Sequence, residues 1–377
     1  MKPEVLIIGT GVIGLSLARS LRKRGIRKIT ILEGGEAVGR EASFAAAGIL
    51  APQAEADRAD EIFRFCNDSN KLYPQFAAEL FDETGIDIEL DRSGTLYLAF
   101  EETDVEEIRK RFKWQKKAGL TVERLSAEEV RKAEPFVSPG VREALYFPND
   151  WQVENRRLMA ALERFSRLND IRIVTGAMVK NLLVENGKII GAETNGEKFF
   201  AEAVVLATGA WTSLIKIAEN ALPLVKIAPI RGQMLSFKTV KRLFFRVVYS
   251  PRGYLVPRRD GRILAGATVE NTGFDKSVTA EGVNFVSQAA FEIAPNLVKL
   301  EISDKWAGLR PFAADGLPVL GAVPEIKNLF VATAHYRNGI LLAPKTGEIL
   351  ADIIVDNRKS EYLEAFGPRR FAAAKAS

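Results

Sequence analysis

The chain has 377 residues, which exceeds one typical domain and favours two domains or one large domain with an insertion. Hydrophobic residues make up 47% and charged residues 27%, a globular composition that excludes a disordered or collagen-like chain. The net charge is +5, but acidic and basic residues are interspersed throughout, so we expect no nucleic-acid partner.

Cys66 is the only cysteine, which excludes an internal disulfide bond and is typical of a reducing compartment. The N-terminus leads directly into a strand-like run, Glu4 to Ile8, with no basic region or cleavage site before it. No apolar run approaches the roughly 20 residues needed to cross a bilayer. We therefore expect a cytoplasmic, soluble protein with no membrane segment.

The first 33 residues have the pattern strand, turn, helix, strand. Residues 5–8 form a short, continuous apolar run, which is typical of a strand covered on both faces. A glycine-rich turn follows, then a helix that ends near Gly25 and a second strand over residues 28–32. Small residues dominate the next segment, 34–52, and ordered loops of this length tend to be functional.

Helices and strands alternate along the rest of the chain. Apolar periodicity predicts helices over residues 59–84, 103–118, 126–132, 155–168, 280–293 and 346–355. Alternating or continuous apolar runs predict strands over residues 95–100, 171–175, 179–185, 189–194, 203–207, 232–238, 245–249, 253–257, 262–266, 302–309 and 329–332. Asn186-Gly187, between two of these strands, predicts a hairpin turn.

The glycine-rich turn has the motif G-x-G-x-x-G, formed by Gly9, Gly11 and Gly14. It follows a predicted strand, opens a helix and precedes Glu33, at the end of the second strand, by 19 residues, which completes the dinucleotide-binding fingerprint. Gly9 allows the tight turn, Gly11 lets the backbone approach a pyrophosphate, and Gly14 allows close packing of helix and strand. Glu33 is suited to accept hydrogen bonds from the adenosine ribose, and it disfavours NADP.

Two further segments distinguish FAD from NAD. Residues 204–211 predict a buried strand that breaks into Ala-Thr-Gly, a second close approach of backbone to a cofactor. Residues 39–43 and 45–49 form a small-residue segment suited to lie along a flavin. An NAD-binding domain needs neither feature, so the sequence predicts bound FAD.

The sequence resembles the D-amino-acid oxidase/glycine oxidase family of FAD-dependent oxidoreductases, and within it the branch that serves thiamine biosynthesis. The resemblance covers essentially the whole chain. Besides the fingerprint, the motifs that carry it are Ser43–Pro52 (SFAAAGILAP), Ala207–Trp211 (ATGAW), Tyr254–Arg258 (YLVPR), Trp306–Pro311 (WAGLRP) with Asp315–Pro318, and His335–Pro344 (HYRNGILLAP).

A zwitterionic amino acid needs a cation for its carboxylate, and arginine supplies a planar, bidentate fork. The resemblance implies that Arg310 clamps this carboxylate, that Tyr254 is a second polar contact, and that Arg337 borders both substrate and flavin. These three are the predicted catalytic residues, and Ile49 joins them as substrate-binding, at a position where the family's thiamine branch usually has Met. The competing interpretation is that the arginines form surface salt bridges and that Tyr254 is a core aromatic residue.

The predicted cofactor-binding residues are Gly9, Gly11, Val12, Ile13, Gly14, Glu33, Gly34, Arg40, Ser43, Ala46, Ala47, Gly48, Val179, Thr208, Gly209, Trp211, His335, Tyr336, Asn338, Gly339, Ile340 and Leu341. His335 is interpreted as a structural or flavin contact and not as a base. Relatives with covalent flavin carry a cysteine just before the region 310–315, which has none here, so we expect non-covalent FAD. No His, Cys and carboxylate constellation has metal-ligand spacing, so we expect no metal.

The nucleotide-type motifs flank a β-rich part of the chain. We therefore predict an α/β fold with a discontinuous, Rossmann-like FAD-binding domain and a mostly antiparallel β-sheet substrate domain. The FAD-binding domain is predicted to comprise residues 1–85, 151–221 and 309–370, and the substrate domain residues 86–150 and 222–308.

The resemblance implies oxidative deamination of glycine or another small amino acid, such as sarcosine or a small D-amino acid, in the service of thiamine thiazole biosynthesis. An imine and then an oxo acid form, and O2 is reduced to H2O2. Because the flavin carries the hard chemistry, no obligate protein base is required. The alternatives are a dye- or quinone-linked amino-acid dehydrogenase and a flavin-binding scaffold without turnover. The expected partners are the small amino acid and O2, and relatives imply a homo-oligomer such as a tetramer.

Overall fold

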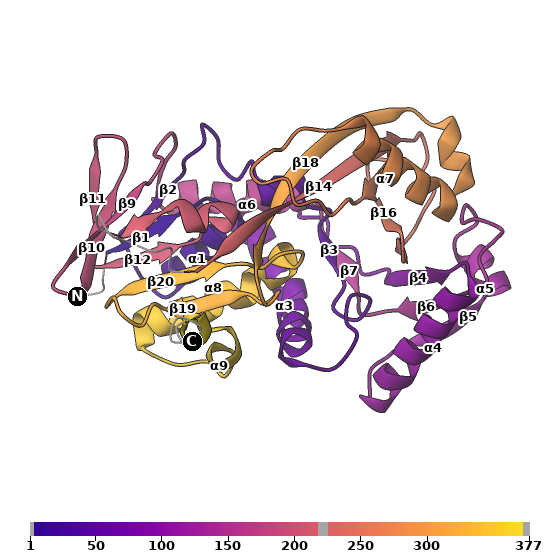
Figure 1. Ribbon diagram of the computed structural model, residues 1–377, viewed down its shortest axis with the longest axis horizontal. Helices are drawn as coiled ribbons and strands as arrows, with labels where there is room; N and C mark the ends of the chain where they lie inside the picture. Colours follow the sequence, from indigo (N-terminus) through magenta and orange to yellow (C-terminus); the bar gives the residue numbers. More distant parts are fainter. Residues whose placement is uncertain (1–3, 218–224, 372–377) are drawn as a thin grey trace.

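Residues 5–32 fold as the strand–helix–strand unit that the sequence predicts. The computed structural model describes residues 4–217 and 225–371, so the predicted domain boundary at 221 lies outside the described residues. In this unit, β1 (Val5–Ile8) leads through the glycine turn into α1 (Val12–Lys23) and then β2 (Ile29–Leu32), and β1 pairs with β2 in parallel. Figure 1 shows this unit at the centre of one half of the molecule.

Strands far apart in the sequence join this unit in a six-stranded sheet with the order β19-β20-β12-β1-β2-β8. The added strands are β8 (Arg172–Val174), β12 (Ala203–Leu206), β19 (Val319–Ala322) and β20 (Leu329–Thr333). All neighbours are parallel except β19 and β20. The sheet therefore has the mostly parallel arrangement of a Rossmann-like fold.

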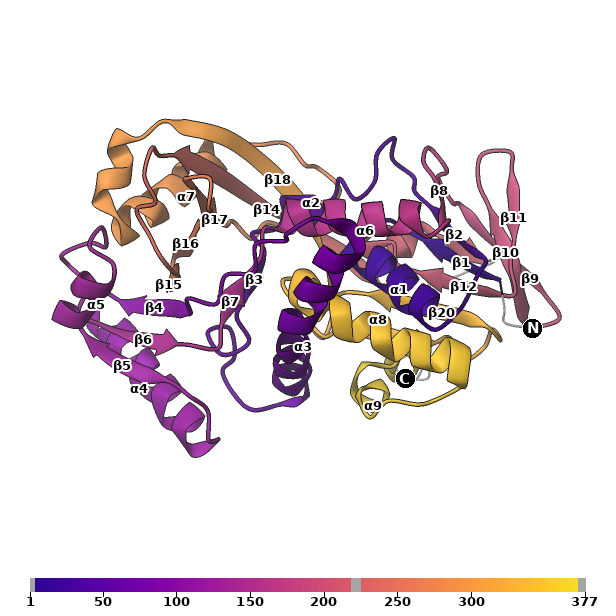
Figure 2. The same ribbon diagram turned by 180° about the vertical axis from the view of Figure 1, so that it is seen from behind.

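Both faces of this sheet are covered, which explains its continuous apolar strands. Val5 and Ile7 of β1 face a core of helices, whereas Leu6 and Ile8 face a small second sheet. The helices, seen in front of the sheet in Figure 2, are α1, α3 (Glu61–Thr84), α6 (Asn155–Leu168) and α8 (Gly339–Asp356). The small sheet consists of β9 (Asn181–Glu185), β10 (Lys188–Glu193), β11 (Lys198–Phe200) and β13 (Lys216–Ile217).

The other half of the molecule contains an eight-stranded sheet with the order β18-β14-β17-β16-β15-β4-β6-β5. Its neighbours are antiparallel except β4 and β15. Its strands are β4 (Thr95–Ala99), β5 (Glu123–Ser126), β6 (Glu143–Phe147), β14 (Ile227–Lys238), β15 (Val247–Ser250), β16 (Gly253–Pro257), β17 (Arg262–Gly266) and β18 (Ile302–Ala313). The mostly antiparallel second sheet is therefore confirmed.

Helices pack against the eight-stranded sheet. α7 (Ala280–Ile293) covers one face with α5 (Ala127–Ala133) beside it, whereas α4 (Glu102–Lys117) packs on the opposite side. The long strands β14 and β18 run from this sheet toward the six-stranded sheet (Figure 1). Within the described residues, no helix is both long and apolar enough to cross a membrane.

Several predicted elements differ in extent. α8 begins at Gly339 rather than at residue 346, because Pro344 interrupts the helical pattern but is accommodated inside the helix. The small-residue segment 34–52 contains α2 (Ala42–Ala45) and β3 (Ile49–Leu50), and β3 pairs with β7 (Trp151–Gln152). The short strands β5, β6, β11, β13 and β19 were not predicted from the sequence. Nor were α9 (Tyr362–Phe366) and three short 3-10 turns, η1 (Gly209–Leu214), η2 (Pro295–Lys299) and η3 (Pro368–Phe371).

Gly9 has a backbone that only glycine adopts easily, with φ of +109°, and a Cβ there would lie 2.4 Å from the carbonyl oxygen of Ala207. We expect Gly9→Ala to lower the free energy of unfolding by about 2–4 kcal/mol, through backbone strain and the clash. Thermal unfolding of the cofactor-free protein, followed by circular dichroism, measures the loss. Gly140→Ala, at an exposed turn where a Cβ meets only Ser138 Oγ at 3.5 Å, is the control and should unfold like the wild type. Equal stability of the two variants would contradict the prediction.

Candidate active site

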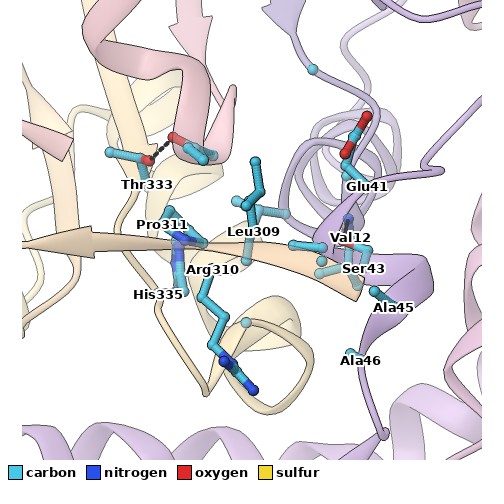
Figure 3. A pocket seen from close by; sticks show the side chains of 18 of the residues that line it. Val12, Glu41, Ser43, Ala45, Ala46, Leu309, Arg310, Pro311, Thr333 and His335 are labelled. Atoms are coloured by element: carbon cyan, nitrogen blue, oxygen red, sulfur yellow. Dashed lines mark hydrogen bonds between the residues drawn. The ribbon is translucent and has the colours of Figure 1, made fainter. Parts of the chain in front are cut away.

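A cavity of about 540 Å³ lies where the two large sheets meet. Its lining comes from the glycine turn, the segment 41–49, the strands β14, β16 and β18, and the beginning of α8. Figure 3 shows Ser43, Ala45 and Ala46 on one side of it, with Pro311 and His335 across from them. A volume of this size is typical of a small-molecule or cofactor site.

The glycine turn presents unbonded amides to the cavity. Val12 N donates to Ser43 Oγ at 2.9 Å, but the amides of Gly11 and Ile13 have no acceptor among the described residues. A Cβ at Gly11 would meet only Ser43 Oγ, at 3.4 Å, so the turn is open to a close approach. The positive end of α1 faces the same space, and such an end favours phosphate groups.

Glu33 lies at the edge of the cavity, after β2, and is held by the turn it faces. Its Oε2 accepts a hydrogen bond from Thr10 N at 3.1 Å and another from the Thr10 hydroxyl. Its Oε1 accepts from Gly35 N at 2.9 Å. The carboxylate is thus fixed in place, and its remaining lone pairs can accept hydrogen bonds from ribose hydroxyls.

A second helix begins at the cavity. The amides of Gly339 and Ile340 line it at the start of α8 and have no acceptor among the described residues. The positive end of this 18-residue helix can therefore stabilise negative charge on a bound cofactor.

The structure brings most of the predicted cofactor residues together. Those that line the cavity are Gly9, Gly11, Val12, Ile13, Glu33, Gly34, Ser43, Ala46, Ala47, Gly48, Val179, Thr208, Gly209, Trp211, His335, Tyr336, Gly339 and Ile340. Gly14, Arg40, Asn338 and Leu341 do not line it. Gly14 packs against the turn instead, Arg40 covers the ring of Phe44 at 4.7 Å, Asn338 caps α8, and Leu341 is buried in the helical core. The roles of all of these residues stay predictions.

Arg310 projects from β18 into the cavity (Figure 3). Its Nη1 donates to the carbonyl oxygen of Thr268 at 3.0 Å, and its guanidinium covers Gly232 of the neighbouring strand, where a Cβ would lie 2.2 Å from Nη1. No carboxylate of the described chain lies within 4.0 Å of this guanidinium. Arg310 is therefore held by backbone and keeps its charge available to a ligand.

Tyr254 lies beside Arg310 in the cavity. Its ring packs 5.4 Å from that of Tyr249, and Gly266 makes room for it, since a Cβ there would lie 2.5 Å from Tyr254 Oη. Burial raises the pKa of Tyr254, so the hydroxyl stays protonated and can donate a hydrogen bond. Ile49 lines the same cavity, so all four predicted substrate residues share one space with the cofactor residues.

Arg337 lines the cavity with an acid that the sequence analysis missed, Glu55. Tyr249 Oη donates to Glu55 Oε1 at 2.9 Å. The negative charge of Glu55 is the largest cause that raises the pKa of Arg337 above its ordinary value. Glu55 follows the motif Ser43–Pro52 closely, and this proximity is the only signal in the sequence that could have identified it.

Other residues that the sequence analysis missed form the mouth and wall. Lys276 pairs with Glu41 at 2.8 Å across the mouth, and its ammonium lies 5.9 Å from the ring of Trp211. Arg258, which is 3% exposed, donates to the carbonyl oxygen of Ala47 at 2.7 Å and so fixes the small-residue wall. Burial lowers the pKa of Arg258 to about 10, which still leaves it charged at neutral pH.

The residues present fit FAD. Unbonded amides at one helix end suit a pyrophosphate, a fixed acid after β2 suits a ribose, and a wall of small residues leaves room for a flavin ring. Cys66 is buried in α3 and does not line the cavity. Over the ranges 4–217 and 225–371, no group of His, Cys, Asp and Glu has the arrangement of a metal site.

Comparisons with known proteins agree with this fit. The family model described as FAD dependent oxidoreductase matches residues 4–353. The glycine oxidase of Pseudomonas aeruginosa is 34% identical over 359 residues, with 94% of this chain and 95% of that protein covered. The bifunctional protein ThiO/ThiG of Trichormus variabilis is 34% identical over 98% of this chain and 55% of that protein. The crystal structure of glycine oxidase from Geobacillus kaustophilus has a TM-score of 0.91 at 33% identity, with 97% of this chain and 98% of that chain covered.

His335 lines the cavity but is buried, and its Nε2 lies 3.1 Å from Thr346 Oγ1. Burial lowers its pKa from 6.5 to about 3, so we expect a neutral ring in the folded protein at every ordinary pH. As the chain's single histidine, it gives one set of imidazole NMR signals, which should not titrate between roughly pH 5 and 8. Signals with a midpoint near 6.5 would contradict this.

The lowered pKa of His335 also affects how the free energy of unfolding depends on pH. Between its folded and unfolded pKa values only the unfolded chain binds this proton, so His335 makes the free energy of unfolding fall as pH falls below 6.5. We expect His335→Gln to remove up to about 1.4 kcal/mol per pH unit of that slope. Denaturation at a series of pH values measures it.

Proposed function

The chain belongs to the family of FAD-dependent oxidoreductases and is an FAD-dependent amino-acid oxidase, and from this premise we propose that it oxidises glycine or another small amino acid. The proposed reaction converts glycine, O2 and water to glyoxylate, ammonia and H2O2. Bound FAD supplies the two-electron chemistry, as acceptor of a hydride from the carbon that carries the nitrogen. Sarcosine and small D-amino acids belong to the same proposed substrate class.

The observation that carries the proposal is the setting of Arg310. A guanidinium that is anchored by the Thr268 carbonyl and lies beside a protonated tyrosine is ready to bind a carboxylate in bidentate fashion. Tyr254 supplies a second donor, and both residues lie in the cavity that continues to the small-residue wall. Binding of the carboxylate orients the α-carbon of the substrate relative to that wall, which is how a bound geometry lowers the barrier to reaction.

The ThiO/ThiG similarity supports a role in thiamine biosynthesis, which we include in the proposal. The second candidate is a dye- or quinone-linked amino-acid dehydrogenase of the same fold. A cytoplasmic location, a homo-oligomeric state and non-covalent attachment of FAD stay predictions.

A panel of amino acids tests the proposal. Without oxygen, glycine or another small amino acid should bleach the yellow flavin, and in air the same substrate should yield one H2O2 per molecule oxidised. Bleaching without reoxidation by O2, together with turnover on artificial dyes, would favour the dehydrogenase. If no amino acid bleaches the flavin, the proposed substrate class is wrong.

We expect Arg310→Met to retain the yellow colour and the fold but to lose about two to four decades in kcat/KM for amino acids. The reason is that an incoming carboxylate loses its charge-assisted partner, which costs about 3–5 kcal/mol in a desolvated site. Arg310→Lys should recover only part of the activity, because an ammonium lacks the two-donor fork. Arg64→Met, at an exposed arginine of α3, is the control and should leave activity intact. Near-normal kcat/KM in Arg310→Met would identify another residue as the clamp.

A further inference from the structure

Glu55 is the acid at the substrate end of the cavity, and its position is fixed from both sides. Asp150 accepts a hydrogen bond from Ala54 N at 2.7 Å. Arg111 Nη1 donates to the carbonyl oxygens of Ala54 and Ala56, in each case at 2.7 Å. Because the backbone is held at Ala54 and at Ala56, on either side of Glu55, its side chain extends from a fixed piece of backbone.

The carboxylate of Glu55 remains open to the cavity. Its Oε1 accepts from Tyr249 Oη, but its Oε2 has no partner among the described residues. The side chain is only partly buried and lines the same space as Tyr254 and Arg337. Its negative charge therefore acts on any group that enters.

The charged side chains at the substrate end of the cavity do not balance one another. Lys276 and Glu41 neutralise each other at the mouth, and the acid after β2 lies at the ribose end, bonded to backbone amides. Two cations and one anion remain at the substrate end, namely Arg310, Arg337 and Glu55. The negative charge of Glu55 raises the pKa of Arg337, which lines the same space.

We propose that Glu55 restricts the substrate to amino acids with a single carboxylate, because its charge opposes Arg337 and leaves Arg310 as the binding site for one carboxylate. This inference rests on the proposed oxidation of small amino acids. A second carboxylate that approaches Arg337 meets the negative charge of Glu55, and like charges a few ångströms apart at a partly buried site repel each other. The substrate end thus has a net positive charge that matches a single carboxylate. Glu55 is therefore a specificity-determining residue.

The test compares two substrates of similar size that differ by one charge, iminodiacetate and N-ethylglycine. In Glu55→Gln, the ratio of kcat/KM for iminodiacetate to that for N-ethylglycine should rise about 10- to 100-fold, because the neutral amide can still accept from Tyr249 but no longer opposes Arg337. Glu55→Asn removes the same charge and should raise the ratio in the same direction. Glu123→Gln, at an exposed acid of β5, is the matched control and should leave the ratio unchanged.

A binding measurement gives a second readout that needs no turnover. Malonate and acetate are titrated into the oxidised holoenzyme and followed through the visible flavin spectrum, and the malonate-to-acetate affinity ratio should rise by a similar factor in Glu55→Gln. Arg337→Met in the Glu55→Gln background should abolish both gains. The inference is overturned if the wild type oxidises glycine but neither ratio changes, or if the gains survive the loss of Arg337. If the wild type bleaches with no amino acid and binds no acetate, the proposed function itself fails.

Discussion

β14 and β18, each 12 residues long, pair from Ile227 opposite Ala313 to Phe237 opposite Ile302, and the geometry of the site depends on this pairing. Within it, Gly232 lies opposite Gly308. The guanidinium of Arg310 covers Gly232, whereas Ala45 of the small-residue wall packs against Gly308, where a Cβ would lie 2.5 Å away. One pair of glycines therefore brings the predicted carboxylate clamp and the predicted flavin wall to a fixed separation, and any larger side chain at either position would force them apart.

Two buried ionisable residues fix the continuation of the small-residue wall. Arg258 and Asp150 are almost inaccessible to solvent, and both bind backbone groups of the segment that runs from Ala47 to Glu55. Removing such groups from water costs free energy, and their hydrogen bonds do little more than offset that cost. The two residues therefore contribute little to the free energy of unfolding by themselves. Their effect is to hold a segment with little regular structure in a single conformation. A site on a loop needs such support to keep its geometry.

Local sequence patterns predicted those parts of the fold that depend on local chemistry. The glycine turn, Glu33 and the Asn186-Gly187 hairpin follow from backbone requirements within a few residues, and the structure places each as expected. The strands β5 and β6 escaped because they are short and carry charged residues, so their alternation is weak. Glu55 escaped for a different reason: its relation to Arg337 exists only after two distant segments have folded together. Arg310 and Tyr254 were predicted through the family resemblance, whereas the glycines that make room for them are apparent only in the folded structure.

The backbone around His335 combines a local conformational requirement with contacts between distant segments. Ala334 and Tyr336 both have left-handed conformations, with φ of +57° and +47°, which cost a side chain about 1–3 kcal/mol each. The chain therefore accepts backbone strain at both positions. Tight packing compensates it, since Ala334 is fully buried and Tyr336 N donates to the carbonyl oxygen of Pro311 at 3.1 Å. The double bend turns the chain from β20 into α8 and places Arg337 at the cavity. The backbone position of Arg337 is thus set by the fold before any ligand binds, and its charge lies within electrostatic reach of Glu55.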